Sequence, residues 1–240
     1  NFSVVPLDVE SAARTFTFTA GNQADAISTA DALFTLFPEA EAVNAISSSA
    51  FSSDDTSSAF AESEASIVGD FAIKAGDTFS FDFAGIIDLF TVTEQPTEIA
   101  TAVLETQYSI FEIGNGATLP VELDFFNMFG EINTPGGLDD FGVEGSEAIA
   151  LLSPIISDNT SPIQTSESLL IDVSGQYQRL FEKDADLALV EVKLGQALTN
   201  REDPVDIPDV SHPWLGLLAI AGVFLQNKQP TKQNKSLLQH

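Results

Sequence analysis

Apolar and polar residues alternate with a period of two along much of residues 1–200, and this pattern constrains the fold most. Such alternation is typical of strands that have one buried face. In 59–68, for example, Ala59, Ala65 and Ile67 fall on one face. The pattern predicts an all-β fold. Strands are expected at 14–19, 59–68, 100–111, 121–129, 169–180 and 187–194.

A β-hairpin is predicted where two alternating segments flank a glycine. Residues 71–74 (FAIK) and 78–83 (TFSFDF) are separated by Ala-Gly-Asp. Gly76 can supply the positive φ angle that a tight connection between two strands needs. In this hairpin, Phe71 and Ile73 would share a face with the phenylalanines of 78–83. One side of the hairpin is therefore expected to be strongly aromatic.

Two segments are expected to depart from the strand pattern. In 24–37, Ile27, Leu33 and Phe34 recur at helical spacing before Pro38, which predicts a helix. Segment 144–152 is expected to be a short helix or a turn. Loops rich in Ser, Gly and Pro are expected at 47–58, 133–142 and 153–168. Many short strands with such connections favour a β-sandwich of jelly-roll type with one or two short helices.

Changes in composition divide the chain into three parts. Residues 1–199 are expected to form the β domain, 200–213 a linker rich in Pro and Asp, and 214–240 an apolar helix with a basic tail. The apolar run 214–225 (WLGLLAIAGVFL) would be ~18 Å long as a helix, against ~30 Å for the hydrocarbon core of a bilayer. It is too short for an ordinary membrane span. We interpret it either as a sorting or anchoring signal with transient membrane contact, or as a buried core helix.

The charge of the chain argues against one large class of partners. With 36 acidic and 9 basic residues, the formal net charge is −27. The last 40 residues hold four of each sign, so the preceding part carries the whole excess. Nucleic-acid binding depends on clusters of Lys and Arg, and is therefore not expected. A hydrophobic content of 44% with 19 Phe is too high for a disordered chain and predicts a packed core.

Side chains suited to catalysis are scarce in the predicted β domain. The chain has no Cys, and its two histidines, His212 and His240, lie in the tail. Ser-His and Cys-His hydrolases are thereby excluded from that domain, as are zinc sites that need Cys or His. No Gly-rich phosphate-binding loop occurs. Carboxylate pairs of the glycosidase type remain, but the only Trp, a common stacking platform for sugars, lies in the tail. We therefore expect no enzymatic activity and no cofactor apart from a metal.

Calcium is the metal that suits this chain, because Ca²⁺ takes carboxylate oxygens as ligands. The candidate ligands are Asp139, Asp140 and Glu144, and further acidic pairs are 54–55 and Asp184 with Asp186. None of them follows the Asp-x-Asp-x-Asp-Gly pattern of known calcium loops. The alternative interpretation is that they are solvated loop carboxylates that keep the protein soluble.

Three segments resemble a group of cyanobacterial secreted proteins. They are 71–83 (FAIKAGDTFSFDF), 171–181 (IDVSGQYQRLF) and 187–197 (LALVEVKLGQA). In that group these elements precede a Pro-Glu-Pro (PEP-CTERM) sorting signal, an apolar helix and a basic end, and exosortase-type processing is inferred. The resemblance covers roughly 59–90 and 169–228, and here the signal is degenerate, with Ile-Pro-Asp-Val at 207–210. It implies export and a role at the cell surface or in an extracellular matrix, and it implies no enzymatic activity.

Two functions remain as hypotheses. The first is a non-catalytic, exported structural protein: a self-associating subunit of an extracellular filament or surface layer, joined by terminal apolar segments or by strand addition. The second is a secreted jelly-roll module that binds a glycan or Ca²⁺ through acidic loops near 133–144. The first residue, Asn1, fits removal of a signal peptide and equally fits a trimmed sequence. The expected assembly residues are Phe2, Val4, Val5, Trp214, Leu215, Leu217, Leu218, Ile220, Val223, Phe224 and Leu225.

Overall fold

The structure is a computed structural model, and its described residues belong to one compact unit. They are 6–20, 24–35, 41–52, 57–93, 98–114, 119–135, 139–159 and 165–201. The chain divides into the units Asn1–Asp203 and Pro204–His240, and the second lies outside the described residues. The predicted linker beyond residue 201 and the predicted apolar helix at 214–240 lie outside them as well.

The described residues form strands and no helix, which confirms the expected all-β fold. Each of the strands expected from alternation lies within an observed strand. None of the described segments is a helix with the length and hydropathy needed to cross a membrane. The strands are β1 (Asp8–Ala20), β2 (Ala24–Thr35), β3 (Glu41–Ser52), β4 (Ser58–Ile73), β5 (Thr78–Val92), β6 (Glu98–Glu112), β7 (Val121–Thr134), β8 (Asp140–Gly145), β9 (Ile149–Asn159), β10 (Ser166–Leu180) and β11 (Ala185–Arg201).

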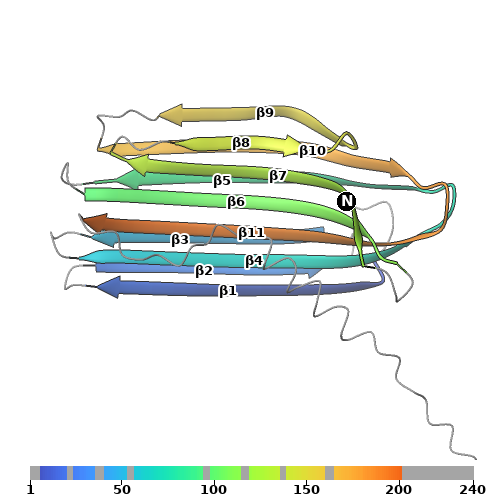
Figure 1. Ribbon diagram of the computed structural model, residues 1–240, viewed down its shortest axis with the longest axis horizontal. Coiled ribbons are helices and arrows are strands. Elements are labelled where there is room, and N and C mark those ends of the chain that lie inside the picture. The colour runs from blue at the N-terminus through green and yellow to red at the C-terminus, as the bar shows by residue number, and fades with distance from the viewer. Residues whose placement is uncertain are drawn as a thin grey trace, which may run out of the picture. The chain divides into compact units, whose positions relative to one another are not determined.

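The strands pair antiparallel in three sheets (Figure 1). The largest sheet has six strands in the order β1-β4-β11-β6-β7-β8. A second sheet has three strands in the order β5-β10-β9, and β2 pairs with β3 in a third. The last described strand, β11, lies in the middle of the large sheet, between β4 and β6. The large sheet is therefore completed by pairing between distant parts of the sequence.

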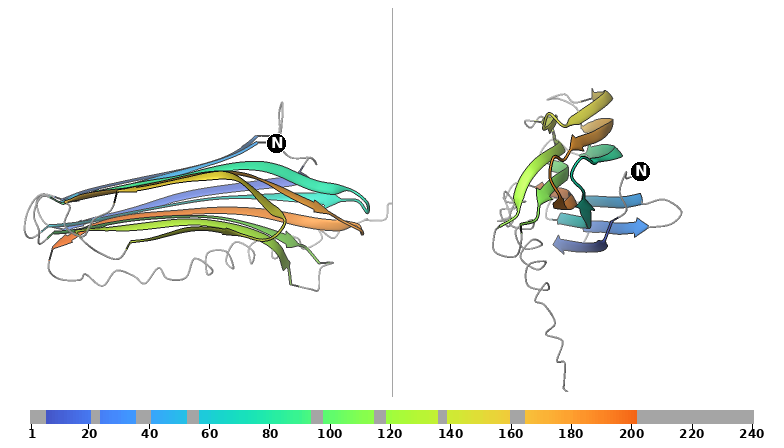
Figure 2. Two further views of the ribbon diagram at one scale, coloured as in Figure 1. Left: turned by 90° about the horizontal axis from the view of Figure 1, so that it is seen from above. Right: turned by 90° about the vertical axis from the view of Figure 1, so that its right-hand side faces the viewer.

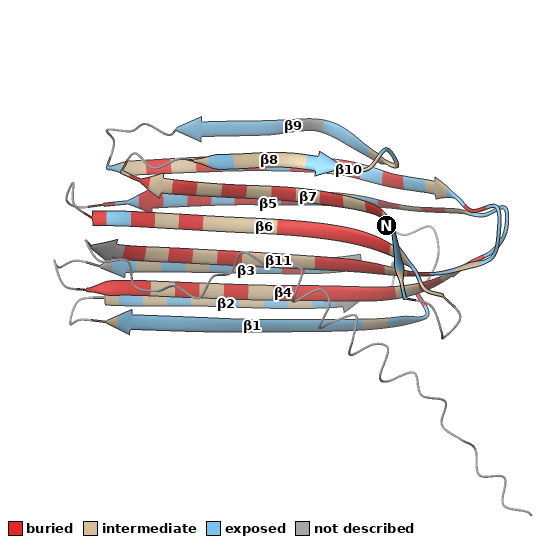
Figure 3. Cartoon of the chain, viewed as in Figure 1, coloured by how far each residue is buried: buried red, intermediate tan, exposed pale blue. Residues whose placement is uncertain are grey.

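Both small sheets cover one face of the large sheet, as the two views of Figure 2 show. β5 contacts β6 and β7, and β10 contacts β7, whereas β2 and β3 contact the region of β1, β4 and β11. One face of β4 contacts both small sheets. Phe71 packs on Phe79 of β5, and the Ser63 hydroxyl lies 2.8 Å from that of Ser48 in β3. Figure 3 shows the result: buried residues are frequent along β4, β6, β7 and β11, and they are consecutive at 65–69 of β4 and at 106–110 of β6.

The core between the large sheet and the three-stranded sheet is aromatic. The Phe81 and Tyr177 rings stack with 5.2 Å between centroids, and Phe83 lies 4.7 Å from Phe126. Such pairs contribute beyond the area they bury. The largest fully buried side chains are Tyr177, Phe71, Phe79, Phe126, Ile73, Ile87, Ile110, Met128, Ile132, Leu169, Ile171 and Leu187.

The predicted hairpin at 71–83 is wrong in its pairing and right in its aromatic character. β4 pairs with β1 and β11, whereas β5 pairs with β10, so residues 74–77 cross from one sheet to another. Gly76 has the expected positive φ, 90°. Phe71 and Phe79 face each other across the core with 4.7 Å between ring centroids. An isolated hairpin has nothing to cover its aromatic face, whereas two facing sheets cover each other's.

A second crossover, at 181–184, runs beside the first. The Gly76 N–H donates to the Phe181 carbonyl at 2.7 Å, and the Phe181 N–H donates to the Asp77 carbonyl at 3.0 Å. The Ala75 N–H donates to Asp184 Oδ1 at 2.9 Å. The two crossovers thus hold each other where β10 lies beside β5 and β11 beside β4.

The predicted helix at 24–37 is wrong, because this segment contains strand β2. The even-numbered residues of 24–32, which include Ser28 and Ala30, are half-buried, whereas Ile27 and Leu33 are exposed. The Ser28 hydroxyl donates to the Glu62 carbonyl of β4 at 2.5 Å. Small side chains on alternate positions let β2 lie close to the large sheet, and this packing overrides the helical spacing of the larger residues.

Two predicted loops are shorter than expected. In 47–58, β3 continues to Ser52, and in 153–168, β9 continues to Asn159 and β10 begins at Ser166. Serine is tolerated in these strands because strand pairing with a neighbour decides the conformation. Segment 144–152 contains a turn, in which the Ile149 N–H donates to the Ser146 carbonyl at 3.0 Å, followed by β9.

Candidate functional site

The outward face of β2 and β3 carries large apolar side chains. Ile27 and Leu33 of β2 and Val43 and Phe51 of β3 are 46–57% exposed. Leu33 and Val43 face each other in the strand register. We call these four residues the β2–β3 patch. Its exposure reverses the usual arrangement of a sheet, because the small residues of this hairpin face the protein and the large ones face outward.

A second patch lies on the outward face of the three-stranded sheet. Ile86 and Ile155 flank Asp172 from the two neighbouring strands, β5 and β9. Leu170 faces Asp88 and so lies diagonally between Ile86 and Phe90. We call the set the β5–β10–β9 patch, and its residues are 38–65% exposed. The members of the patch are Ile86, Phe90, Leu152, Ile155 and Leu170.

The third exposed feature is the edge strand β1. It pairs with β4 along its whole length, and no described strand pairs with its other edge. Figure 3 shows it exposed almost throughout, and Phe16 and Phe18 are 56% and 47% exposed. Natural edge strands are usually shortened, bulged or protected by Pro or Lys. β8 has 6 residues, and β9 contains Pro154 and a register irregularity, whereas β1 has none of these protections.

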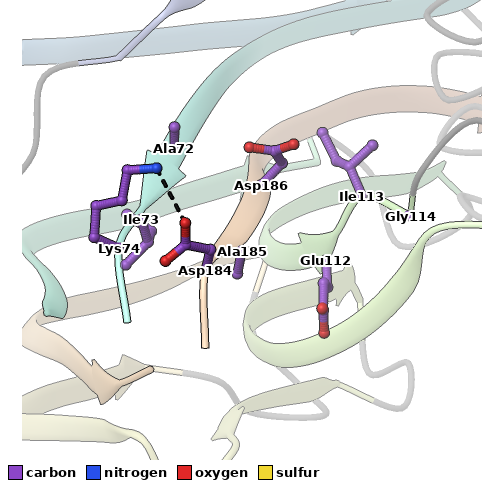
Figure 4. Close-up of a pocket in the computed structure, with 9 residues that line it drawn as sticks. All are labelled: Ala72, Ile73, Lys74, Glu112, Ile113, Gly114, Asp184, Ala185 and Asp186. Atoms are coloured by element: carbon purple, nitrogen blue, oxygen red, sulfur yellow. Dashed lines mark hydrogen bonds and ion pairs between the residues drawn. The ribbon is translucent and has the colours of Figure 1, made fainter. Parts of the chain in front are cut away.

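A groove of about 380 Å³ lies at the ends of β4, β6 and β11 (Figure 4). Lys74 Nζ lies 3.1 Å from Asp184 Oδ2. The backbone N–H of Ala75 and, after it, Lys74 hold the pKa of Asp184 below its usual value. Asp186 lines the same groove, and Glu112 points away from Lys74. The hydrogen bonds of Asp184 therefore fix the crossover, and the groove has no converging set of carboxylates among the residues that line it.

A buried carboxylate, Asp124 of β7, joins the large sheet to the three-stranded sheet. Its Oδ2 accepts hydrogen bonds from the Tyr177 hydroxyl at 3.0 Å and from Arg179 Nη1 at 2.6 Å. Burial, followed by the charge of Asp124, raises the pKa of Tyr177. The hydrogen bond from Arg179 to Asp124 raises the pKa of the guanidinium. The three side chains thus form a charge-assisted link between two layers.

A second polar cluster lies on β11, under β3. Lys193 Nζ donates to the Asn44 carbonyl at 2.6 Å and lies 3.7 Å from Glu191 Oε1. Burial raises the pKa of Glu191, and the charge of Lys193 acts in the opposite direction. Asn44 Nδ2 donates to the Ala65 carbonyl of β4 at 3.1 Å. Polar bonds therefore fasten β3 where the aromatic core ends.

The candidate calcium ligands are not brought together. Asp139 Oδ1 accepts from the Asn133 N–H at 2.9 Å, so it closes the connection between β7 and β8. Asp140 and Glu144 lie on one face of β8, four positions and so ~13 Å apart, whereas calcium ligands lie ~2.5 Å from the ion. Among the described residues, no group of three Asp, Glu or His side chains could hold a metal ion. The acidic pair 54–55 lies outside the described residues.

The predicted assembly residues, Phe2 to Val5 and Trp214 to Leu225, lie outside the described residues. The sequence predicts a strand at 14–19 but not its position at the edge of a sheet, and it predicts neither patch. Alternation gives the two faces of a strand, but it does not tell which face meets another sheet. One available signal is the run of small residues at the even positions of 24–32, which marks a close approach to another sheet.

Comparison with known proteins adds no relative from which a role could be transferred. The chain matches no protein-family model, no curated protein and no solved structure. The candidate site is therefore defined by geometry alone: two outward apolar patches and the edge of β1.

Proposed function

We propose that this chain is a non-catalytic, exported structural protein, a self-associating subunit of an extracellular filament or surface layer. The observation that carries the proposal is the β2–β3 patch together with the β5–β10–β9 patch. Large apolar side chains gathered on outward sheet faces are typical of protein–protein contacts. A formal net charge of −27 opposes indiscriminate clumping, so that assembly depends on specific apolar joints.

Export is part of the proposal and rests on the resemblance to cyanobacterial secreted proteins with a PEP-CTERM-like signal. The terminal apolar segments, 2–5 and 214–225, are proposed as additional joints. Fractionation of the source cells with an antibody against the β domain tests the location. Recovery in the extracellular or cell-surface fraction supports export, and recovery in the cytosol alone contradicts it.

We also propose that the β domain is a β-sandwich related to jelly rolls. The paired strands β4 and β11 continue through the two neighbouring crossovers into the paired strands β5 and β10. A long antiparallel pair that passes from one sheet to the facing sheet is the element from which jelly rolls are built.

Assembly is tested by size-exclusion chromatography with light scattering and by negative-stain microscopy of the full chain. Phe90, at 65% the most exposed member of its patch, is replaced in Phe90→Ser. The matched control is Val121→Ser, which changes a side chain that is 60% exposed at the start of β7, outside both patches. We expect polymers from the full chain, fewer or shorter polymers from Phe90→Ser, and no change in the control. A chain ending at Asp203 measures the contribution of the second unit.

A monomer at all concentrations would contradict the proposal. If that monomer also melts at a higher temperature with Ca²⁺, or is retained on a glycan column, the acidic-loop binding module becomes the better description. Equal assembly of Phe90→Ser and of the full chain would exclude the β5–β10–β9 patch as a joint.

A further inference from the structure

Most of the edge strand β1 is free of acidic residues, although the chain as a whole is strongly acidic. Asp8 and Glu10 lie in its first three residues, and segment 12–20 (AARTFTFTA) contains no acid. Its one charged side chain, Arg14, forms an ion pair with Glu64 of the neighbouring strand β4. Segment 12–20 therefore presents no uncompensated charge, and its free edge can approach a like-charged molecule with little repulsion.

We propose that segment 12–20 of β1 pairs antiparallel with the same segment of a second copy of this chain. We place a two-fold axis perpendicular to the sheet, so that the outer faces of the two sheets lie on the same side of the joined sheet. Even-numbered residues then lie opposite even-numbered residues of the second copy, and odd-numbered residues opposite odd-numbered ones. Pairing along all of β1 places Arg14 opposite Arg14 of the other copy, and like charges directly opposite are destabilising.

Moving the axis to Phe16 removes this conflict. Phe16 then faces Phe16 of the second copy, and Arg14 faces Phe18, so the two exposed aromatic residues of the edge gain cross-strand partners. Thr15 faces Thr17, and both acids of β1 lie beyond the paired segment. The pairing satisfies backbone groups along the free edge and joins two six-stranded sheets into one continuous sheet.

This contact is small beside the ~1,600 Å² of total surface that a stable complex commonly buries. We therefore expect a reversible dimer whose fraction rises with concentration. A two-fold contact closes on itself, so growth into a filament needs a second joint, such as an outward patch. The inference thus rests on the assembly role proposed above and specifies one of its contacts.

Disulfide trapping tests the partner and the register, because the chain contains no Cys. Two full-length variants, Thr15→Cys and Thr17→Cys, are mixed and gently oxidised, and dimers are measured on non-reducing gels. Facing Cβ atoms lie ~5 Å apart and diagonal ones ~7–8 Å, and a disulfide needs ~4 Å. We expect several-fold more dimer from the mixture than from either variant alone. Equal or lower yield from the mixture would overturn this register.

A lysine at the edge tests the contact without a cysteine. Thr17→Lys puts a charge opposite Thr15 of the second copy, and we expect loss of the dimer with an unchanged melting temperature, because Thr17 is exposed. Val121→Lys, which changes an exposed residue outside β1 and outside both patches, is the matched control and should leave β1 trapping intact. Persistent polymers without trapping at β1 would refute this inference and leave the assembly proposal standing. Absence of any association would refute both.

Discussion

The two small sheets lie on the same face of the large sheet, yet different interactions hold them there. The three-stranded sheet contributes Phe79, Phe81 and Tyr177 to a core of interlocking aromatic rings. The β2–β3 hairpin instead places small side chains against the large sheet. Among the described residues, hydrogen bonds fasten this hairpin to the large sheet. The Ser48 hydroxyl contacts that of Ser63, and Lys193 donates to the Asn44 carbonyl.

This difference shows that covering a sheet does not require a second hydrophobic core. In the aromatic region, stability comes from burial of apolar area, which favours large residues on the inward side. In the β2–β3 region, close approach of the backbones favours small residues on the inward side, with Ile46 as the larger exception, and the residues of the β2–β3 patch face outward. The same geometry that fastens this hairpin therefore creates the exposed patch on its other side.

The largest contrast is expected between two phenylalanines. Phe71 is fully buried in the aromatic region, and Phe71→Ala should cost ~3–5 kcal/mol of unfolding free energy because it leaves a cavity. Phe51, on the β2–β3 patch, is 46% exposed, and Phe51→Ala should cost less than ~1 kcal/mol. Urea denaturation followed by circular dichroism measures both. Similar losses would show that the two regions are not stabilised differently.

Two glycines test how tightly the two regions are packed: Gly175 against its neighbours within the three-stranded sheet, and Gly195 against β3 and β4. A Cβ on Gly175 would lie 2.5 Å from Phe83 Cζ and 3.0 Å from the Ala150 carbonyl oxygen. One on Gly195 would lie 3.0 Å from Ser63 Oγ and 3.1 Å from Ile46 Cδ1. Gly175→Ala and Gly195→Ala should each cost ~1–3 kcal/mol, with the larger loss at Gly175. Hydrogen exchange should show that Gly195→Ala loosens β3 selectively. Uniform loosening of all strands would contradict the separate packing of the hairpin.

A smaller loss is expected from the polar contacts of the hairpin. The Ser48 hydroxyl donates to the Gly195 carbonyl at 2.9 Å and contacts Ser63. Ser48→Ala removes both bonds and should cost ~1–2 kcal/mol. Ser49→Ala, at the next and exposed position, is the matched control and should be neutral within ~0.5 kcal/mol. Equal effects of the two variants in thermal melts would argue that Ser48 adds nothing to docking.

The smallest effect is a pH dependence at the boundary of the two regions. Because burial raises the pKa of Glu191, the folded chain retains this proton to a higher pH than the unfolded chain. Its contribution is fully present below the unfolded pKa and is lost as the pH rises through the raised folded pKa. Glu191→Gln should therefore gain stability relative to the unsubstituted chain as the pH rises through this interval, measured by urea denaturation. The exposed Asp88→Asn is the control, and a constant difference for Glu191→Gln would contradict the assignment.

Alternation in the sequence was sufficient to predict the all-β fold and the positions of six strands. It failed where neighbours in space are distant in sequence. The segment 24–37 carries apolar residues at both helical and strand spacing. Pairing with β3 and the close approach to β4, where Ser28 donates to the Glu62 carbonyl, select the strand. The aromatic face at 71–83 was predicted correctly, but its partner strand, β10, follows some 90 residues later.

Prediction of the interaction surface was limited for the same reason. The free edge of β1 depends on its pairing with β4, which is distant in sequence: Arg14, for example, faces Glu64, 50 positions away. The patches depend on which face of a strand meets a second sheet. Neither property is contained in the local pattern of any one segment.

The position of β11 has a consequence for folding during synthesis of the chain. A ribosome or secretion channel that releases the N-terminus first delivers β4 and β6 long before the strand that lies between them. Until Ala185–Arg201 arrives, the large sheet lacks the strand that joins β4 to β6. Contacts of such long sequence separation make acquisition of the native state slow. The large sheet is thus completed only after nearly all of the described part of the chain has been synthesised.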